Sequence, residues 1–286
     1  MTSTNATDTL PRPTSLAEVK GWFFPADQLL FDWFLARQQA RDVHGDLLEL
    51  GAYMGKSAIF MGGYLRTEET FTVCDLFDSP ALDDPNSREM NRSYATLTRR
   101  AFESNYLSFH DELPKILQGP SSIVTDHVAE NSCRFAHIDA SHLYEHVHSD
   151  IEAAAQLLGP DGIVVLDDFR AEHCPGVAAA TWGAVATTGL KPLCITGTKF
   201  YGTWGGGHDE IHQELVEMLK QRGDLWHGVE QVAGRAMIRI DGKKAKSPAQ
   251  PTSKHRAADG DKPAGQVPTQ ARRSLSARLA RPFRGR

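Results

Sequence analysis

The sequence predicts an α/β protein in which helices cover both faces of a mostly parallel sheet. Apolar stretches of strand length alternate with helical stretches of ten or more residues along most of the chain, the pattern of parallel strands joined by crossover helices. Continuously apolar strands are typical of sheets buried on both faces. Four of these strands end in carboxylates, at Glu49, Asp75, Asp139 and the pair Asp167 and Asp168. Ligands of such sheets bind at this edge.

Each element is predicted from its local pattern. Apolar residues at helical spacing, among them Leu29, Leu30 and Trp33, indicate an amphipathic helix over 25–42. Polar residues 77–93 suggest an insertion loop. The other predicted strands and helices are, in order, strands over 46–50, 70–76, 114–119, 133–139, 162–169, 193–204 and 234–241, and helices over 56–65, 94–106, 142–158, 176–189 and 208–222.

Composition excludes several classes of protein. A hydrophobic fraction of 41% in 286 residues supports a sizeable core, and no apolar run approaches the length of a membrane span. The N-terminal residues lack the basic and apolar regions of a signal peptide. The cysteines, Cys74, Cys133, Cys174 and Cys194, form no C-x-x-C pair, so we expect neither a zinc knuckle nor a disulfide framework. A reducing, cytoplasmic location fits this composition.

Charge is distributed unevenly. The net charge is −5, yet residues 243–286 hold twelve Lys or Arg against two Asp, a net +10 that leaves about −15 for residues 1–242. We predict a disordered N-terminus over 1–14, one folded domain over 15–242 and a disordered basic tail over 243–286. Leu275, Leu279 and Phe283 alternate with arginines. This end of the tail is therefore either a solvated charged segment or a short helix in weak contact with an anionic membrane.

The stretch DLLELGAYMGKS, residues 46–57, predicts a nucleotide-type site, because a strand leads through glycines into a helix N-terminus. Gly51 and Gly55 allow a ligand to approach the backbone closely. The G-x-G-x-x-G pattern of pyrophosphate cofactors is absent, and Glu49 would repel a pyrophosphate. A carboxylate instead suits a cofactor with an ammonium and a sulfonium, such as S-adenosylmethionine. Asp75 is then placed to accept hydrogen bonds from its ribose hydroxyls.

The motif LELGAYMGKSAIFM resembles the first motif of class I S-adenosylmethionine-dependent methyltransferases, closest to the metal-dependent O-methyltransferases of the catechol type. HIDASHLYEHVHSDI and LLGPDGIVVLDDF are similar to the macrocin-type bacterial branch. The resemblance covers roughly residues 44–190. It implies a Rossmann-like class I methyltransferase fold with a seven-stranded sheet. The expected cofactor-binding residues are Glu49, Gly51, Ala52, Tyr53, Gly55, Ser57, Asp75, Gly119, Ser121, Ser122 and Asp139.

The resembled families hold a divalent metal with carboxylates at the positions of Asp139, Asp167 and Asp168. Three carboxylates on one sheet edge would repel one another without a cation, and hard oxygen ligands suit Mg²⁺. We therefore expect Mg²⁺, or another divalent cation, at these residues. The catechol-type enzymes carry a lysine three residues after the first metal ligand, where this chain has His142. His142 is the expected general base, with Asp139 beside it as the second catalytic residue.

The expected acceptor is a hydroxyl group of a small molecule, with a sugar or glycoside preferred to a catechol or other phenol. Tyr201, Trp204 and Phe169 are candidates to stack on its ring, although aromatic residues in such positions often belong to the core. A nucleic-acid methyltransferase that uses the basic tail is a rival, and the acidic body argues against it. A non-catalytic S-adenosylmethionine-binding protein is another rival. We expect no nucleic-acid partner, and a homo-oligomer is possible.

Overall fold

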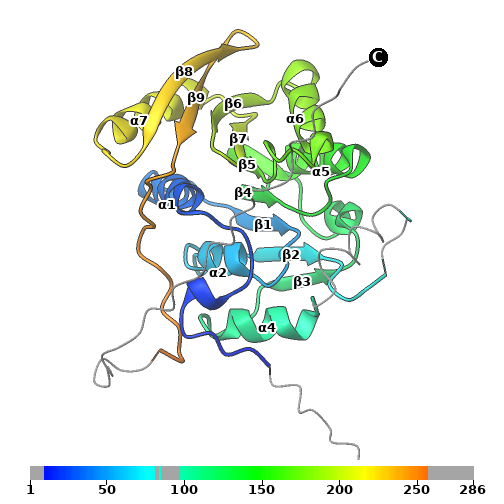
Figure 1. Cartoon of the computed structure of the whole chain (residues 1–286). Helices are drawn as coiled ribbons and strands as arrows, with labels where there is room; N and C mark the ends of the chain where they lie inside the picture. Colours follow the sequence, from blue (N-terminus) through cyan, green and yellow to red (C-terminus); the bar gives the residue numbers. More distant parts are fainter. Residues whose placement is uncertain (1–9, 81–83, 85–96, 257–286) are drawn as a thin grey trace, which may run out of the picture. The chain divides into compact units, whose positions relative to one another are not determined.

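The computed structural model describes residues 10–80, 84 and 97–256, which are built on one nine-stranded sheet (Figure 1). The strands are β1 (Asp46–Leu50), β2 (Phe71–Asp75), β3 (Lys115–Gln118), β4 (Cys133–Ile138), β5 (Leu158–Leu166), β6 (Lys191–Ile195), β7 (Phe200–Thr203), β8 (Trp226–Val232) and β9 (Arg235–Asp241). They are ordered β3-β2-β1-β4-β5-β7-β6-β9-β8. The five strands from β3 to β5 in this order pair in parallel, whereas β7 is antiparallel to β5 and β6.

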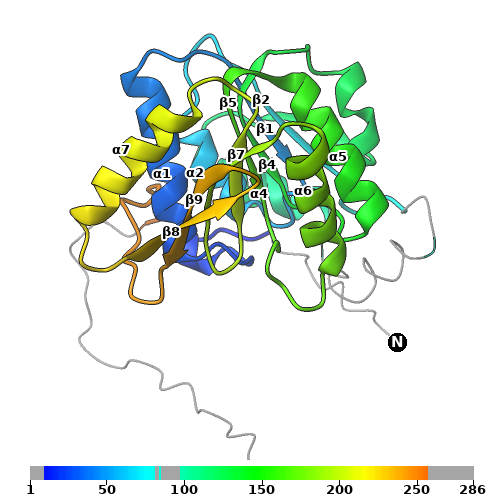
Figure 2. The same cartoon turned by 90° about the horizontal axis from the view of Figure 1, so that it is seen from above.

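Helices cover both faces of the sheet, as Figure 2 shows. One face packs against α1 (Pro25–Ala40), α2 (Lys56–Gly62), α4 (Arg99–Leu107) and α7 (His208–Lys220). The other packs against α5 (Tyr144–Leu157), α6 (Pro175–Thr187) and the 3₁₀ helix η2 (Ser121–Asp126). Successive strand side chains point to opposite faces. In β1, Leu47 therefore joins the core under α1, while Leu48 and Leu50 join the core under α5.

The strand order places a ligand site beside β1 and β4. β1 continues into α2 on one face, and β4 continues into α5 on the other. The connections therefore diverge at this point of the sheet, and α/β proteins bind ligands in the crevice that such a switch opens at the carboxyl ends of the strands. The acidic residues that end these strands all lie at this edge.

The predicted sheet had seven strands, and the structure corrects this number to nine. The segment predicted as one strand over 193–204 is two strands, β6 and β7, because the chain reverses between Thr196 and Lys199, where Thr196 N–H donates to the Lys199 carbonyl. The strand β8 was not predicted, because its exposed residues lack the apolar pattern on which the prediction relied. It pairs with β9 through a turn at Ala233 and Gly234, both at positive φ.

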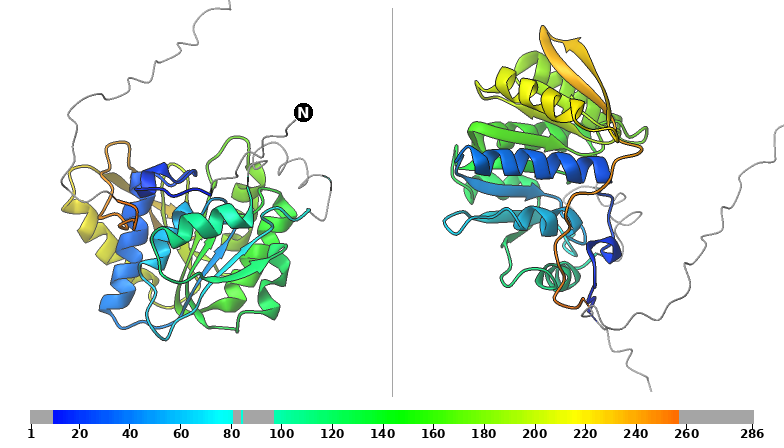
Figure 3. Two further views of the ribbon diagram at one scale, coloured as in Figure 1. Left: turned by 90° about the horizontal axis from the view of Figure 1, so that it is seen from below. Right: turned by 90° about the vertical axis from the view of Figure 1, so that its left-hand side faces the viewer.

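The domain boundary at residue 242 also needs correction. Residues 243–256 run beside the N-terminal segment and α4 (Figure 3). The buried Ser253 hydroxyl donates to the Pro13 carbonyl, and Lys254 N–H donates to the Ser108 carbonyl. Residues 10–14, part of the predicted disordered N-terminus, belong to the same contact region. We call residues 243–256 the C-terminal strap.

Several predictions fall outside the described residues. They concern residues 1–9, most of the insertion loop over 77–93, the start of the helix predicted over 94–106, and the basic residues from 257 onward. Among the described residues no helix is long and apolar enough to cross a membrane.

Candidate active site

A cavity of about 1010 Å³ opens at the carboxyl edge of the sheet. The loops that follow β1, β2, β3, β4 and β5 line it, together with residues 20–24, which precede α1. Its volume lies at the upper end of the range for small-molecule sites, so two ligands can share it. Of the predicted site residues, the following line the cavity: Gly51, Ala52, Tyr53, Ser57, Asp75, Gly119, Ser121, Ser122, Asp139, His142, Asp167 and Asp168.

The loop after β1 is shaped by Gly51. Its φ is +79°, and a Cβ at this position would lie 2.1 Å from the Asp139 carbonyl oxygen. Gly51 N–H donates to the Cys74 carbonyl, and Asp139 N–H donates to the Leu50 carbonyl. The loops after β1 and β4 are therefore in direct backbone contact, which only glycine permits here. Gly55, at φ +89°, caps α2 and does not line the cavity.

Asp75 connects this loop to the end of β2. Its Oδ2 accepts hydrogen bonds from Ala52 N–H at 2.7 Å and Tyr53 N–H at 3.0 Å, and its Oδ1 accepts from Phe77 N–H at 2.6 Å. Burial raises the pKa of Asp75, and these N–H donors oppose the rise. A carboxylate has about four acceptor sites. In the structure the Asp75 carboxylate mainly holds the loop after β1 in place. The predicted hydrogen bonds from ribose hydroxyls would therefore use the acceptor sites that these N–H groups leave open.

Glu49 lies beneath the cavity and is fully buried. Its Oε1 is 2.8 Å from His137 Nδ1. Burial raises the pKa of Glu49 to about 8, against the opposing effect of the Ser57 hydroxyl. Glu49 is thus protonated at neutral pH and does not face the cavity, so the structure does not support the predicted direct contact with a cationic cofactor.

Two buried residues that the sequence analysis missed continue this chain of contacts. Burial and the charge of Lys199 lower the pKa of His137 well below its usual range. The neutral ring therefore donates from Nδ1 to Glu49, and its Nε2 accepts from Lys199 Nζ at 3.1 Å. Lys199 Nζ also donates to Asp167 Oδ2. Both residues could have been noticed in the sequence, because each is a polar residue within an apolar strand pattern: His137 in FAHID and Lys199 in TKFYG.

Lys199 keeps its charge in spite of its position. Its side chain is 1% exposed, and Nζ lies 5.9 Å from the centre of the Phe23 ring. Burial by itself lowers the pKa of a lysine, but Asp167, Asp139 and Asp27 together raise the pKa of Lys199 above its usual value. Ammonium and carboxylate thus form a buried ion pair under the cavity floor.

The three predicted metal ligands do not form one group. The ligand atoms of Asp139 and Asp167 cluster with His137, whereas those of Asp168 cluster with His142 and Cys174. Both oxygens of Asp167 have partners, since Oδ2 accepts from Lys199 and Oδ1 accepts from Asp168 N–H at 2.8 Å. Mg²⁺ demands near-ideal octahedral geometry from converging oxygens. The residues, as the structure arranges them, do not fit a three-carboxylate Mg²⁺ site.

His142 and Asp168 form a pair at the cavity wall. His142 Nε2 lies 3.0 Å from Asp168 Oδ2. Although burial acts in the opposite direction, His142 lowers the pKa of Asp168, which therefore stays ionised. Asp168 adopts a φ of +52°, and residues held in this region often cluster at functional sites. His173 lies near His142, with 6.2 Å between the ring centres.

Asp139 belongs to the first of these groups and also interacts electrostatically with Asp168 and His142 of the second. Burial and the neighbouring charge of Asp167 raise its pKa well above the usual range. A carboxyl group that holds its proton in a cavity is a candidate for proton transfer. Asp139 can therefore exchange a proton or donate a hydrogen bond to a bound ligand.

The end of the cavity beside β3 is polar. Gly119 N–H donates to the Asp75 carbonyl at 3.0 Å, and Ser121 begins η2. The buried Asp150 of α5, which sequence analysis missed, lies against Ser121. Burial raises the pKa of Asp150 to about 6, and the Ser121 hydrogen bond opposes this rise. This is the end of the cavity at which the sequence predicts the adenine.

The aromatic residues at the cavity differ from those considered in the sequence. Tyr201 is fully buried and donates to Asp27, and Phe169 packs against Trp182 and Phe200. Neither they nor Trp204 line the cavity. The aromatic residues that do so are Trp22, Phe23, Phe24, Tyr53 and Tyr144. Trp22 is 64% exposed and stacks on Tyr53, with 5.8 Å between the ring centres.

Residues 48–169 match a family model described as a methyltransferase domain. The O-methyltransferase NovP is a solved structure with a similar fold, with a TM-score of 0.52 and 20% identity over 62% of this chain and 78% of that one. A TDP-rhamnose 3′-O-methyltransferase, CalS11, gives a TM-score of 0.44 and 18% identity over 63% of this chain and 79% of that one. No curated protein matches the chain. Residues 48–169 thus match a methyltransferase domain, and the strand order from β3 to β6 is that of the Rossmann-like class I methyltransferase fold.

Proposed function

We propose that the chain transfers the methyl group of S-adenosylmethionine to a hydroxyl oxygen of a small molecule, preferably a sugar or glycoside. The observation that carries the proposal is the His142–Asp168 pair, which lies on the wall of the same cavity as the glycine loop. A neutral hydroxyl is a weak nucleophile, so a base must remove its proton as it attacks the methyl donor. NovP, whose fold is similar, is described as an O-methyltransferase, which agrees with this proposal.

The proposed reaction is a direct displacement. His142 accepts the hydroxyl proton while an oxygen lone pair attacks the methyl carbon, and the carbon–sulfur bond breaks to leave the neutral thioether S-adenosylhomocysteine. Asp168 stabilises the imidazolium that forms, as a carboxylate does beside a catalytic histidine. The cavity contributes mainly by alignment, since two reactants held in line avoid much of the entropy cost of their encounter.

The donor occupies the part of the cavity between the glycine loop and η2. Ser57, residues 51–53, Asp75, Ser121 and Ser122 all line the cavity. In this proposal Ser57 and the backbone of residues 51–53 border the methionine end, Asp75 borders the ribose, and the two serines of η2 border the adenine. The acceptor then lies toward His142 and the aromatic residues of the rim.

A sugar suits this rim for two reasons. Exposed aromatic faces such as that of Trp22 pack against the apolar face of a sugar ring. Asp139 and Asp168 can accept hydrogen bonds from neighbouring hydroxyls. A catechol or other phenol uses the same two features, so it remains the second candidate. Mg²⁺ stays a sequence prediction and enters no step here, because its three predicted ligands are divided between two groups.

The experiment is a two-stage measurement on the full chain. Calorimetry first measures the binding of S-adenosylmethionine, which we expect. Transfer of a labelled methyl group is then followed with panels of glycosides, phenols and RNA. Transfer to glycosides supports the preferred acceptor, and transfer to phenols supports the second. Binding of the donor without transfer to any panel would favour a non-catalytic role, and salt-sensitive methylation of RNA would contradict the proposal.

A further inference from the structure

We propose that the ammonium group of Lys199 takes the place of a divalent metal ion at Asp167, so that this active site works without one. The inference rests on the proposed function only for its catalytic part. Its structural part concerns how a crowded set of acidic side chains is neutralised, and it can be tested without any acceptor.

The first step is the charge that has to be neutralised. Carboxylate oxygens of Asp139 and Asp167 lie within 4.8 Å of each other and of a His137 ring nitrogen. Carboxylates this close repel one another unless a cation lies between them. The sequence analysis assigned that role to a metal because the resembled families hold a divalent ion with carboxylates at these positions.

The second step is that a cation is already present. Lys199 Nζ donates to Asp167 Oδ2 and lies 3.1 Å from His137 Nε2. The lysine belongs to the reversal between β6 and β7, and the pairing of β7 with β5 brings it beside the end of β5. Phe23 and Phe31 enclose the ammonium, with ring centres at 5.9 Å and 6.0 Å. The ammonium therefore contacts two of the three residues, His137 and Asp167, whose ligand atoms cluster on this side of the site.

The third step is the remaining carboxylate. Asp168 pairs with His142 and not with Lys199. The charge of +1 on Lys199 therefore neutralises the carboxylate of Asp167. The imidazolium of His142 that forms during proton transfer neutralises the carboxylate of Asp168. Two protein cations thus replace the two positive charges of a divalent ion, each beside one carboxylate.

The test measures metal binding directly. The full chain is freed of metals with EDTA, desalted and titrated with Mn²⁺, with bound ion followed by electron paramagnetic resonance. We expect no Mn²⁺ binding by the wild-type chain that depends on Asp139, Asp167 or Asp168. In Lys199→Met, which removes the charge but keeps a side chain of similar length, Mn²⁺ should bind at least about tenfold more tightly than in wild type, because Asp167 is then unpaired.

Matched variants make the result specific. Lys191→Met removes a half-buried lysine whose Nζ donates to the Gly205 carbonyl, and it should leave Mn²⁺ binding unchanged. The double variant Lys199→Met with Asp167→Asn removes both members of the pair. It should lose the Mn²⁺ binding gained by Lys199→Met and recover thermal stability relative to that single variant, because no buried charge is left unpaired.

Three outcomes overturn the inference. One is a stoichiometric Mn²⁺ in the wild-type chain that Asp139→Asn or Asp167→Asn removes. Another is a folded Lys199→Met variant that gains no Mn²⁺ affinity. The last is methyl transfer that stops in EDTA and returns with Mg²⁺. Failure of the proposed function can be distinguished from failure of this inference. If the chain does not bind the donor or transfer methyl groups, the Mn²⁺ titrations still show whether Lys199 prevents metal binding at Asp167.

Discussion

At the scale of single residues, the donor loop depends on the missing side chain of Gly51. Gly51 and Gly189 have nearly equal φ angles, +79° and +78°. A Cβ on Gly51 would collide with the Asp139 carbonyl, whereas a Cβ on Gly189 would meet nothing within 4 Å. Alanine substitutions at the two glycines therefore distinguish two contributions to the loss of stability. One is the unfavourable φ, which both positions share, and the other is the collision, which occurs only at Gly51.

We expect Gly189→Ala to lower the free energy of unfolding by about 1–2 kcal/mol, the cost of a left-handed conformation for a residue with a Cβ. Gly51→Ala should cost clearly more and should also weaken S-adenosylmethionine binding, because the loops after β1 and β4 have to separate. Urea unfolding and calorimetry measure both effects. Equal losses in the two variants would contradict the close backbone contact.

His142 is the residue on which the proposed proton transfer depends. We expect His142→Ala to lower the rate of methyl transfer by about 10²–10⁴-fold, the usual contribution of a general base. Donor affinity should change little, since all predicted donor contacts except Asp139 lie on other loops. His148→Ala is the control, because His148 lies on α5, shortly after the loop that holds His142, and contacts Glu152 instead of lining the cavity. An unchanged rate in His142→Ala would exclude it as the base.

Glu49 predicts a pH dependence of stability. Its folded pKa of about 8 lies above its ordinary value of 4.5. The folded state therefore retains a proton that the unfolded chain releases, and this contribution to stability is lost as pH rises toward 8. His137, whose pKa is lowered, has the opposite effect, but its contribution is confined below about pH 6.5.

The measurement is urea unfolding between pH 7 and pH 8. In this range the wild-type chain should lose stability as pH rises, by at most about 1.4 kcal/mol per pH unit from this group. Glu49→Gln should show a smaller loss over the same range, because its amide cannot release a proton. Parallel pH profiles for the two proteins would contradict the raised pKa of Glu49.

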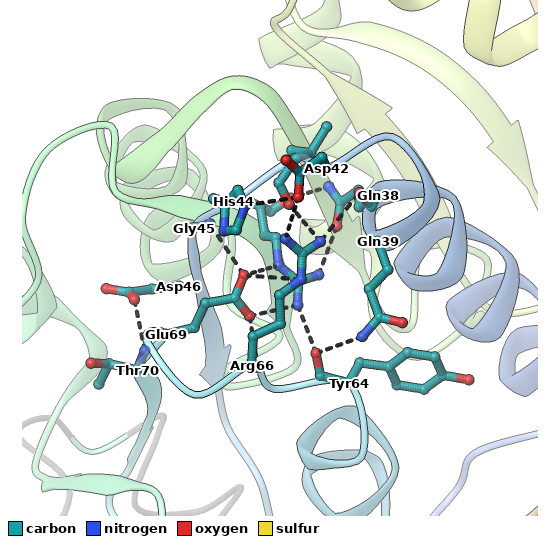
Figure 4. Close-up of polar contacts among 12 residues, drawn as sticks. Gln38, Gln39, Asp42, His44, Gly45, Asp46, Tyr64, Arg66, Glu69 and Thr70 are labelled. Carbon is teal, nitrogen blue, oxygen red and sulfur yellow. Dashed lines mark hydrogen bonds and ion pairs between the residues drawn. The ribbon is translucent and has the colours of Figure 1, made fainter.

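At the scale of elements, the two ends of the strands have different roles. The carboxyl ends form the cavity, whereas the amino ends of β1, β2 and β4 are held by a buried network (Figure 4). Arg134 of β4 is fully buried and donates through Nε and Nη2 to the two oxygens of Glu69, both at 2.8 Å. Glu69 also accepts from Arg66 N–H and Gly45 N–H. This network fixes the sheet from the edge opposite the site.

We expect Glu69→Gln to lower the free energy of unfolding by about 3–5 kcal/mol, because it leaves the buried Arg134 charge without its partner. Glu217→Gln is the matched control. Its pair with Lys220 is exposed, and its loss should stay below about 1 kcal/mol. Donor binding by the folded fraction should be unchanged in both variants. A small effect of Glu69→Gln would mean that water reaches Arg134.

At the scale of the whole chain, the C-terminal strap joins distant segments. Lys254 contacts the residues that directly follow α4, through the Ser108 and His110 carbonyls and Asp111. Gln250 Nε2 donates to Gln28 of α1. The strap thus secures the N-terminal segment, whose residues 20–24 line the cavity.

A chain that ends at Arg256 should unfold at the same temperature as the full chain. One that ends at Gly242 should be less stable by roughly 1–3 kcal/mol, because the Ser253 and Lys254 hydrogen bonds and the packing of Ala245 against the core are lost. Thermal unfolding followed by circular dichroism compares the three lengths. Equal stability of all three would show that the strap contributes nothing.

The sequence by itself determined the Rossmann-like methyltransferase fold, the succession of the first five strands along the chain, and twelve of the residues that line the cavity. These follow from local patterns, since the glycines, the strand ends and the helical periodicity are all readable within short windows. Asp75, Asp139 and His142 were found in this way. The predicted cytoplasmic location, oligomer and tail function stay predictions.

Only the tertiary structure decided which polar side chains meet. Lys199 lies 32 residues beyond Asp167 along the chain, and the antiparallel pairing of β7 with β5 brings them together. The same holds for Glu49 and His137, which are 88 residues apart. Strand pairing in a sheet is a long-range property that no local window contains. The sequence therefore located the acidic edge, while the fold determined that a lysine lies beneath it.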